Sequence, residues 1–361
     1  MTQIIQISPS LLFGDAVGNL MCAIDSMVKE EGFDASICAD LVHPRIDREK
    51  HNVVNTFADA TEEDILILHM ASAYDRLDEF VKSPAKKIMV YHNVTPPRFF
   101  NKYNLMGARA CREGLQQTKS LAGEVDFCIA DSAWNKQDLI DMGYTCPIEV
   151  CPVYIPWEDY KTPPNASVLE RYRDVAGTNV MFCGRVVPNK CYQDIVKAFW
   201  AYKNHYDPDA RLFLVGVMSE VDPFCVKLNA YIHDLGLDGS VIFPGHIGFD
   251  EILAYYTLAD VFLCQSEHEG FCVPLLEAAV FDTPVVAYDA AAISWTLGGS
   301  GILLDEKDPF VTAGVMDRVV RDEKLRAEVI AGQRQRLEYF SAENVRRMFL
   351  DQLYGFLKGQ Q

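Results

Sequence analysis

The sequence has 361 residues, 49% of them hydrophobic and 23% charged, which is typical of a folded globular protein rather than a disordered chain. The length exceeds that of one ordinary domain and favours two. A formal net charge of −18 argues against nucleic acid as the main partner, because phosphate binding needs an accumulated positive field.

The sequence also argues against a membrane span and a zinc site. No stretch reaches the roughly 18 to 20 apolar residues that cross a bilayer. The first residues, Met1 to Ile7, are typical of a β-strand rather than a signal peptide. The 11 cysteines are odd in number and contain no C-x-x-C pair. Such an unpaired set fits a reducing compartment, so we expect a cytoplasmic protein without a bound metal.

The first half of the chain alternates short apolar runs with amphipathic segments of helical length. Strands are predicted at Ile4–Ile7, Ala35–Cys38, Ile65–His69, Ile88–Tyr91 and Phe127–Ala130, and helices at Asn19–Glu31 and Ala133–Met142. This alternation indicates a parallel sheet covered by helices, because buried parallel strands are apolar on both faces.

Four prolines between residues 152 and 164 predict a linker, after which the alternation resumes. Strands are predicted at Val180–Cys183, Arg211–Val215, Val241–Phe243, Val261–Cys264 and Val285–Tyr288, and helices at Tyr192–Tyr206, Asp222–Leu235, Asp250–Leu258 and Pro274–Phe281. A last helix is predicted at Asn344–Leu357. We therefore predict α/β domains at 1–152 and 177–335, a linker at 153–176 and a C-terminal helical segment at 336–361.

The most specific motif lies at residues 266–278, where a strand is followed by a polar turn and then by Pro274 at the start of a helix. A helix N-terminus at the carboxyl end of a parallel strand offers free N–H groups, and phosphates bind in such places. Two acids, Glu269 and Glu277, flank the turn. They would accept hydrogen bonds from a sugar or ribose, or they are two solvated acids around a helix start.

A second motif lies at residues 182–190. A strand runs into Gly184, and Arg185 and Lys190 follow it before the next helix. Two cations in such a loop can neutralise a diphosphate, Arg185 through its planar fork and Lys190 as a point charge. The alternative is a surface loop with ordinary charges.

Together these motifs resemble the retaining GT-B glycosyltransferases that include glycogen synthase-like and mannosyl-transferring enzymes. In that family two glutamates separated by seven residues match Glu269 and Glu277, and a Gly-Arg…Lys pattern matches Gly184, Arg185 and Lys190. Asp282 stands where the family usually has glycine, and aspartate tolerates a left-handed backbone better than most residues.

The resemblance implies roles for the residues around the donor. Glu269 would contact the donor sugar, Glu277 would hold the ribose, and Arg185 and Lys190 would hold the diphosphate. The turn at Gly270, Phe271, Cys272 and Val273 would offer backbone N–H groups, and the segment at Ile247 would lie beside the base.

The N-terminal half contributes two more candidate sites by the same resemblance. His92 follows a predicted strand where the family often has a histidine near the transferred sugar. Gly14 and Asp15 follow the first strand and resemble the family's glycine-rich first loop, which faces donor phosphate and acceptor. A structural histidine and a plain tight turn are the alternatives.

The resemblance implies a GT-B architecture of two Rossmann-like, doubly wound parallel-sheet domains that face each other across a cleft, with the last helix returning to the first domain. It implies metal-independent, retaining transfer of a sugar from a nucleotide-diphosphate donor without a further cofactor. The surroundings of His92 resemble enzymes of surface-polysaccharide assembly, so mannose or rhamnose is the expected sugar and GDP-mannose the first donor to test. The rivals are a non-catalytic GT-B subunit and a sugar phosphorylase.

One basic segment, from Arg98 to Lys119, departs from the acidic character of the chain. It includes Lys102, Arg109 and Arg112 against a single acid, Glu113. We expect either a solvated helix face or a surface for a lipid-linked acceptor or an anionic membrane. The expected acceptor is a glycan or a lipid-linked hydroxyl at the inner face of the membrane.

Overall fold

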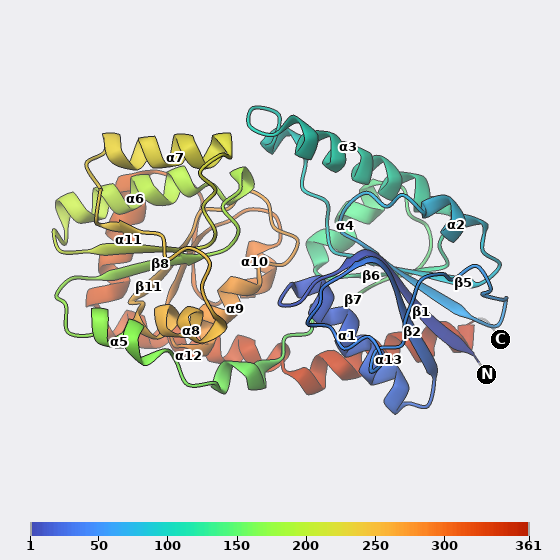
Figure 1. Cartoon of the computed structure of the whole chain (residues 1–361). Coiled ribbons are helices and arrows are strands. Elements are labelled where there is room, and N and C mark those ends of the chain that lie inside the picture. Colours follow the sequence, from blue (N-terminus) through green and yellow to red (C-terminus); the bar gives the residue numbers. More distant parts are fainter. Residues whose placement is uncertain (1, 360–361) are drawn as a thin grey trace. The chain divides into compact units, whose positions relative to one another are not determined.

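The computed structural model describes residues 2–359, which divide into two compact units. Unit 1 contains the N-terminal residues to 101, residues 105–156 and the chain from 339 onward, and unit 2 contains residues 102–104 and 157–338. Two sequence-distant segments thus build unit 1. Each unit is an α/β structure with its own parallel sheet (Figure 1).

The described part of unit 1 contains a seven-stranded parallel sheet in the order β3-β2-β1-β4-β5-β6-β7. The strands are β1 (Gln3–Leu11), β2 (Asp34–Val42), β3 (Val53–Val54), β4 (Ile65–Met70), β5 (Lys86–Tyr91), β6 (Phe127–Ala130) and β7 (Ile148–Val150). All six residues of β4 are buried, as expected for a central strand covered on both faces.

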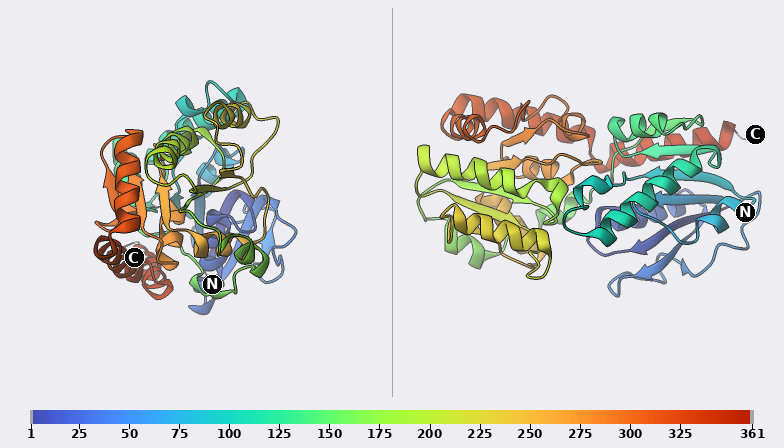
Figure 2. Two further views of the ribbon diagram at one scale, coloured as in Figure 1. Left: turned by 90° about the vertical axis from the view of Figure 1, so that its left-hand side faces the viewer. Right: turned by 90° about the horizontal axis from the view of Figure 1, so that it is seen from above.

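The helices of unit 1 cover both faces of its sheet. They are α1 (Ala16–Glu30), α2 (Leu77–Lys82), α3 (Leu105–Ser120), α4 (Ala133–Asp141) and α13 (Ala342–Gly359), with short 3₁₀ turns η1 (Pro97–Phe99) and η2 (Leu121–Gly123). Figure 2 shows the red helix α13 alongside the elements of unit 1. Arg346 of α13 pairs with Glu30 and Glu31 at the end of α1, and Phe356 packs against Phe127 of β6. The C-terminal segment therefore belongs to unit 1.

The described part of unit 2 contains a six-stranded parallel sheet in the order β10-β9-β8-β11-β12-β13. The strands are β8 (Asn179–Cys183), β9 (Arg211–Val215), β10 (Val241–Ile242), β11 (Val261–Cys264), β12 (Val285–Tyr288) and β13 (Ile302–Leu304). Strands β8, β9 and β11 lie at the centre of the sheet, and their residues Phe182, Phe213 and Phe262 are fully buried in the core of unit 2.

The helices of unit 2 are α5 (Ala166–Tyr172), α6 (Tyr192–His205), α7 (Pro223–Asp234), α8 (Phe249–Leu258), α9 (Val273–Val280), α10 (Ile293–Leu297), α11 (Pro309–Arg321) and α12 (Glu323–Tyr339), with 3₁₀ turns η3 (Trp157–Lys161) and η4 (Pro188–Lys190). Helices α6 and α7 lie on one side of the sheet and α5 and α8 on the other (Figure 1). The predicted linker is therefore partly ordered structure of unit 2, because η3 and α5 fall within residues 157–176.

Local chemistry explains several helix starts. Asp222 accepts hydrogen bonds from the N–H groups of Phe224 and Cys225, and Pro223 occupies the first helical position of α7. Asp308 and Pro309 repeat this arrangement at α11. An aspartate side chain satisfies N–H groups that the helix itself leaves unpaired, and proline lacks the N–H that would be wasted there. These caps fix where the loops at the sheet edge end.

Two further observations bear on the predictions. Asp282 has a φ of 54°, so the left-handed backbone expected at this position is present, and its carboxylate pairs with Arg334. No helix within residues 2–359 combines the length and the apolarity that crossing a bilayer requires.

Candidate functional site

The candidate site of unit 2 lies where the strand order of its sheet reverses. After β8 the chain adds β9 and β10 on one side, and it then adds β11 and β12 on the other. The loops that leave β8 and β11 consequently diverge, and ligands of doubly wound sheets bind in the crevice between such loops. The predicted motifs at residues 182–190 and 266–278 cover most of these two loops and extend into β8 and α9.

A buried ion pair joins the two loops. Lys190 Nζ lies 2.5 and 2.7 Å from the two carboxylate oxygens of Glu269, and the two side chains are only 13% and 8% exposed. Burial alone would lower the pKa of Lys190, but the adjacent Glu269 carboxylate more than offsets this effect and the pKa is raised. Lys190 therefore stays charged, and the pair is not a set of solvated surface charges.

One side-chain and one backbone hydrogen bond hold the same two loops together. The Asn189 amide donates to the carbonyl of His268, and the N–H of Glu267 donates to the carbonyl of Asn189, both at 2.9 Å. A side chain at Gly216, after β9, would place Cβ 2.1 Å from the carbonyl oxygen of Gly184, so only glycine fits there. The loops after β8, β9 and β11 are thus fixed relative to one another.

Arg185 differs from Lys190 in its surroundings. It is exposed, and its guanidinium makes no hydrogen bond or ion pair with any other described residue. Beyond it, the turn at Gly270, Phe271 and Cys272 leads into α9, with Cys272 as the N-cap in a left-handed conformation at φ 73°. The site therefore offers one unpaired cation and one helix N-terminus, both favourable to an anion.

Glu277, the second acid of the motif, lies on α9 and is bound by two tyrosines. Its Oε1 accepts from the Tyr160 hydroxyl at 2.5 Å and its Oε2 from the Tyr256 hydroxyl at 2.6 Å. Burial raises the pKa of Glu277, and the two hydroxyl bonds oppose this shift. In the described part of the chain, the Glu277 carboxylate is thus stabilised by hydrogen bonds from two hydroxyl groups and not by an ion pair with a cation.

The predicted base segment lies after β10. Ile247 is half-buried against the core of unit 2. Nearby, a cavity of about 560 Å³ is lined by residues of the β9–α7 loop, α7 and the segment after β10, among them Met218, Cys225, Phe243 and Gly245. Its volume is in the range of small-molecule sites.

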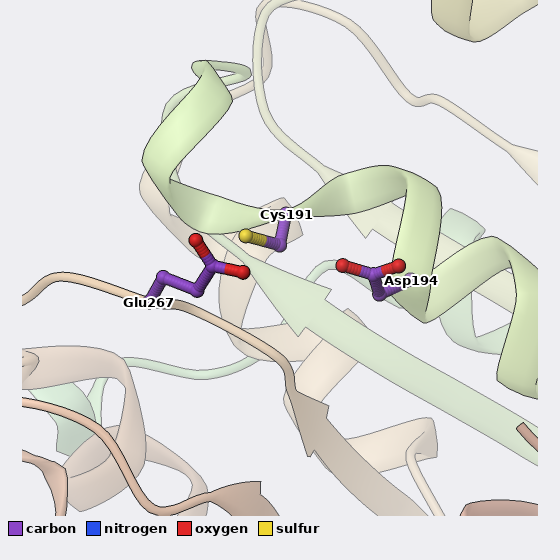
Figure 3. Close-up of side chains that lie close together, drawn as sticks. All are labelled: Cys191, Asp194 and Glu267. Carbon is purple, nitrogen blue, oxygen red and sulfur yellow. The ribbon is translucent and has the colours of Figure 1, made fainter. Parts of the chain in front are cut away.

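Three potential metal ligands lie close together near the same loops, and a lysine forms ion pairs with two of them. Figure 3 shows Cys191 and Asp194, at the start of α6, beside Glu267. One ligand atom of each lies within 4.8 Å of the others. Lys307 Nζ lies 2.8 Å from Glu267 Oε1 and 3.3 Å from Asp194 Oδ2. An ammonium group thus supplies the positive charge between these acids, and we assign no metal to them.

The candidate site of unit 1 also lies at the reversal of its strand order, between β1 and β4. His92 follows β5, and its Nδ1 lies 2.8 Å from Asp131 Oδ2, which follows β6. His92 Nε2 lies 3.0 Å from His69 Nδ1 on β4, and His69 Nε2 lies 2.9 Å from Gln6 Oε1 on β1. The four side chains form one hydrogen-bonded chain across four neighbouring strands.

The direction of these hydrogen bonds follows from the amide of Gln6. Its nitrogen donates to the Met21 carbonyl, so its oxygen faces His69 and accepts from Nε2. Burial lowers the pKa of His69 well below its ordinary value, and His92 lowers it further, so His69 is neutral and its Nδ1 accepts from His92. Both ring nitrogens of His92 are therefore engaged, and one must leave its partner before it can bond a substrate.

Gly14 and Asp15 lie at the start of α1. Gly14 has a φ of 76°, and Asp15 is the N-cap residue without a side-chain capping bond. Both are exposed. Gly18 is required by packing, because a Cβ there would lie 2.1 Å from the carbonyl oxygen of Leu12.

The second unit has a match among known protein families. Residues 175–336 match the family model of glycosyl transferases group 1. We call these residues the group 1 domain. Both motifs that carry the resemblance lie within these matched residues.

Curated relatives agree with that match over part of their length. A D-inositol 3-phosphate glycosyltransferase of Acidothermus cellulolyticus is 32% identical over 166 residues, which cover 44% of this chain and 36% of the relative. A second, from Xylanimonas cellulosilytica, is 26% identical over 238 residues, which cover 63% of this chain and 56% of the relative. The matched part of the chain thus spans about half the length of these curated relatives, or less.

Solved structures confirm the GT-B fold. Sucrose-phosphate synthase from Thermosynechococcus elongatus matches with a TM-score of 0.75 over 100% of both chains at 16% identity. The Anabaena protein HepE, in complex with UDP-glucose, matches with a TM-score of 0.77 over 98% of this chain and 100% of that chain at 17% identity.

Several residues of these sites were not predicted from the sequence. Asp131 directly follows a predicted strand, a position that could have marked it as a neighbour of His92. His69 and Gln6 lie inside strands, where polar residues are uncommon, but their partners are far away in sequence. Nothing in the sequence pattern marks Tyr160 as a site residue, because it lies in the proline-rich segment predicted to be a linker.

Proposed function

We propose that the protein is a glycosyltransferase that moves a sugar from a nucleotide-diphosphate donor to a hydroxyl group. The observation that carries this proposal is the buried Lys190–Glu269 pair, which brings both predicted motifs together at the strand-order reversal of the group 1 domain. The match of that domain to glycosyl transferases group 1 supports it.

The donor would bind along the two loops. The exposed Arg185, with Lys190 behind it, would face the diphosphate, and the N–H groups at Gly270, Phe271, Cys272 and Val273 would meet its oxygens at the N-terminus of α9. Glu269 would face the donor sugar, Glu277 would bind the ribose and Ile247 would lie beside the base. Gly184 would let the first loop approach the diphosphate closely. The GT-B rivals remain a non-catalytic subunit and a sugar phosphorylase.

For the donor we propose GDP-mannose first, with UDP- and dTDP-sugars, including rhamnose donors, as alternatives. HepE is a GT-B protein that was solved with UDP-glucose, which supports testing UDP-sugars early. For the acceptor we propose a glycan or lipid-linked hydroxyl of surface-polysaccharide assembly at the cytoplasmic face of the membrane. The names of the curated relatives support adding inositol 3-phosphate to the acceptor panel.

Nucleotide binding is the first test. A ligand at 100 times its dissociation constant stabilises the folded state by roughly 2.7 kcal/mol, which thermal unfolding detects easily. We expect one of GDP, UDP, dTDP or ADP to raise the melting temperature of the wild type, and Arg185→Ala to reduce the increase. No response to any nucleotide would favour the non-catalytic rival. Activity driven by free phosphate would favour the phosphorylase.

Transfer should be retaining and should not require a metal. The cations Arg185 and Lys190 and the N-terminus of α9 would stabilise the departing diphosphate, and in such enzymes the incoming hydroxyl attacks on the leaving-group face without a protein nucleophile. We expect an unchanged rate of transfer in EDTA, measured as release of the nucleoside diphosphate. Loss of activity in EDTA that manganese restores would contradict this mechanism.

The basic face of α3 is proposed to contact an anionic membrane or lipid-linked acceptor. Arg109 and Arg112 are exposed on this helix, and Leu105 and Met106 at its start are 75% and 85% exposed. Each basic residue near an anionic surface contributes about 1 kcal/mol. Reversing both charges removes these two contributions and adds repulsion, so binding to anionic liposomes should weaken by at least roughly thirty-fold. Lys82→Glu, at another exposed lysine of unit 1, is the control, and equal binding by both variants would remove the idea.

A further inference from the structure

The carboxylate of Glu277 has an unusual environment for a buried acid. Each of its oxygens accepts one hydrogen bond from a tyrosine hydroxyl, from Tyr160 and Tyr256. No lysine, arginine or histidine forms an ion pair with it among residues 2–359. Hydroxyl donors fix the orientation of a carboxylate without neutralising it, so a strong acceptor remains.

The two tyrosines come from different elements. Tyr256 is fully buried on α8, where its ring stacks on Phe262 and Phe281. Tyr160 lies on η3. The centroid of its ring lies 5.4 Å from that of Trp157 and 5.2 Å from that of Phe249, at the start of α8. These ring contacts place the Tyr160 hydroxyl independently of its bond to Glu277.

The acceptor positions that remain free on the Glu277 carboxylate indicate which ligand it can bind. An ionised carboxylate has about four acceptor positions, two on each oxygen. The tyrosines occupy one on each oxygen. One position on each oxygen remains, and Glu277 is not fully enclosed. Two neighbouring acceptors suit two neighbouring hydroxyls, as in the 2′,3′-diol of a ribose.

We propose that Tyr160 is a positioning residue that holds Glu277 in the orientation in which its remaining lone pairs accept from both ribose hydroxyls. This inference rests on the proposed function, in which Glu277 binds the ribose. The ligand class is then a ribonucleoside diphosphate, which excludes the dTDP-sugars among the donors proposed above, because their deoxyribose lacks the 2′-hydroxyl. A deoxyribose leaves one buried acceptor position without a donor, and sites built for a hydroxyl discriminate strongly against ligands that lack it.

Calorimetric titration with GDP, dGDP, UDP and dUDP tests this role. Tyr160→Phe removes the hydroxyl and keeps the ring that packs on Trp157 and Phe249. A hydrogen bond to a charged group contributes about 1.5–3 kcal/mol, so we expect wild type to prefer the ribonucleotide by roughly tenfold or more. Tyr160→Phe should weaken binding of the ribonucleotide by roughly tenfold and shrink that preference.

A matched control is Tyr255→Phe. Tyr255 precedes Tyr256 on α8, but its ring packs on Tyr172 and Phe213, away from Glu277. It should leave both the affinity and the ribose preference unchanged. In a Glu277→Gln background, Tyr160→Phe should cause no further loss of the preference for ribonucleotide over deoxyribonucleotide. This double variant also serves if Tyr160→Phe alone folds poorly, because it has no Glu277 charge left with a single donor.

The outcomes separate the inference from the proposed function. Unchanged ribose preference in Tyr160→Phe, with a wild type that binds nucleotide, overturns the inference alone. Equal weakening of ribo- and deoxyribonucleotides overturns it too, because a general structural role would produce that result. Tighter binding by Tyr160→Phe overturns it in favour of a hydroxyl that competes with the ligand. A wild type that binds none of the nucleotides overturns the proposed function and this inference with it.

Discussion

Lys190→Ala is expected to lower the free energy of unfolding by about 3–5 kcal/mol, because it leaves the buried carboxylate of Glu269 without its partner. The Glu269 side chain is 8% exposed, and both of its oxygens bond to Lys190 Nζ. A buried charge that loses its counterion must be protonated or solvated, and either change destabilises the fold. Chemical denaturation followed by circular dichroism measures the difference.

The control for this loss is Lys197→Ala on α6. Lys197 also pairs with an acid, Asp194, at 3.2 Å, but its side chain is 45% exposed. Exposed pairs of this kind typically contribute about 0.2–1 kcal/mol. Adding Glu269→Gln to Lys190→Ala should restore much of the lost stability, since no charge is then left buried. A loss below about 1 kcal/mol in the single variant would contradict the buried pair.

Arg185→Ala is expected to reduce turnover at saturating donor by roughly a hundred- to thousand-fold, which corresponds to about 2.7–4 kcal/mol of transition-state stabilisation. Negative charge grows on the diphosphate as the sugar bond breaks, so a cation at this place acts more strongly on the transition state than on the bound donor. Arg185 is exposed and without a side-chain partner among the described residues, so its loss should change stability by less than about 0.5 kcal/mol. Its kinetic effect can be measured without a folding defect.

Steady-state kinetics of four further variants sharpens this test. Glu277→Gln should mainly raise the Michaelis constant of the donor, because a ribose contact is made equally before and during the reaction. Arg173→Ala, at an exposed arginine of unit 2 outside the two loops, should leave both constants unchanged. Lys190→Ala and Glu269→Ala should reduce turnover as Arg185→Ala does, in the fraction that remains folded. Near-normal turnover in all three would favour the non-catalytic GT-B subunit.

The sequence by itself determined the two parallel sheets and most of their strands. The predicted strands at 65–69, 127–130 and 261–264 coincide with β4, β6 and β11 to within a residue, and the predicted strand at 88–91 lies within β5. These segments are short apolar runs between turn signals, and their strand character is a local property. The left-handed backbone at Asp282 was also local. Strands β3, β7 and β13 were missed, because two or three residues with incomplete burial leave little pattern.

The tertiary structure alone decided which polar residues meet. Lys190 and Glu269 are 79 residues apart, and Tyr160 and Glu277 are 117 apart. The two motifs indicated a shared site, but the sequence did not show that Lys190 of one motif pairs with Glu269 of the other. Likewise His92 was singled out alone, although it forms one chain with Asp131, His69 and Gln6. Local patterns record burial and backbone preference, while contacts between distant side chains depend on the order in which strands join a sheet.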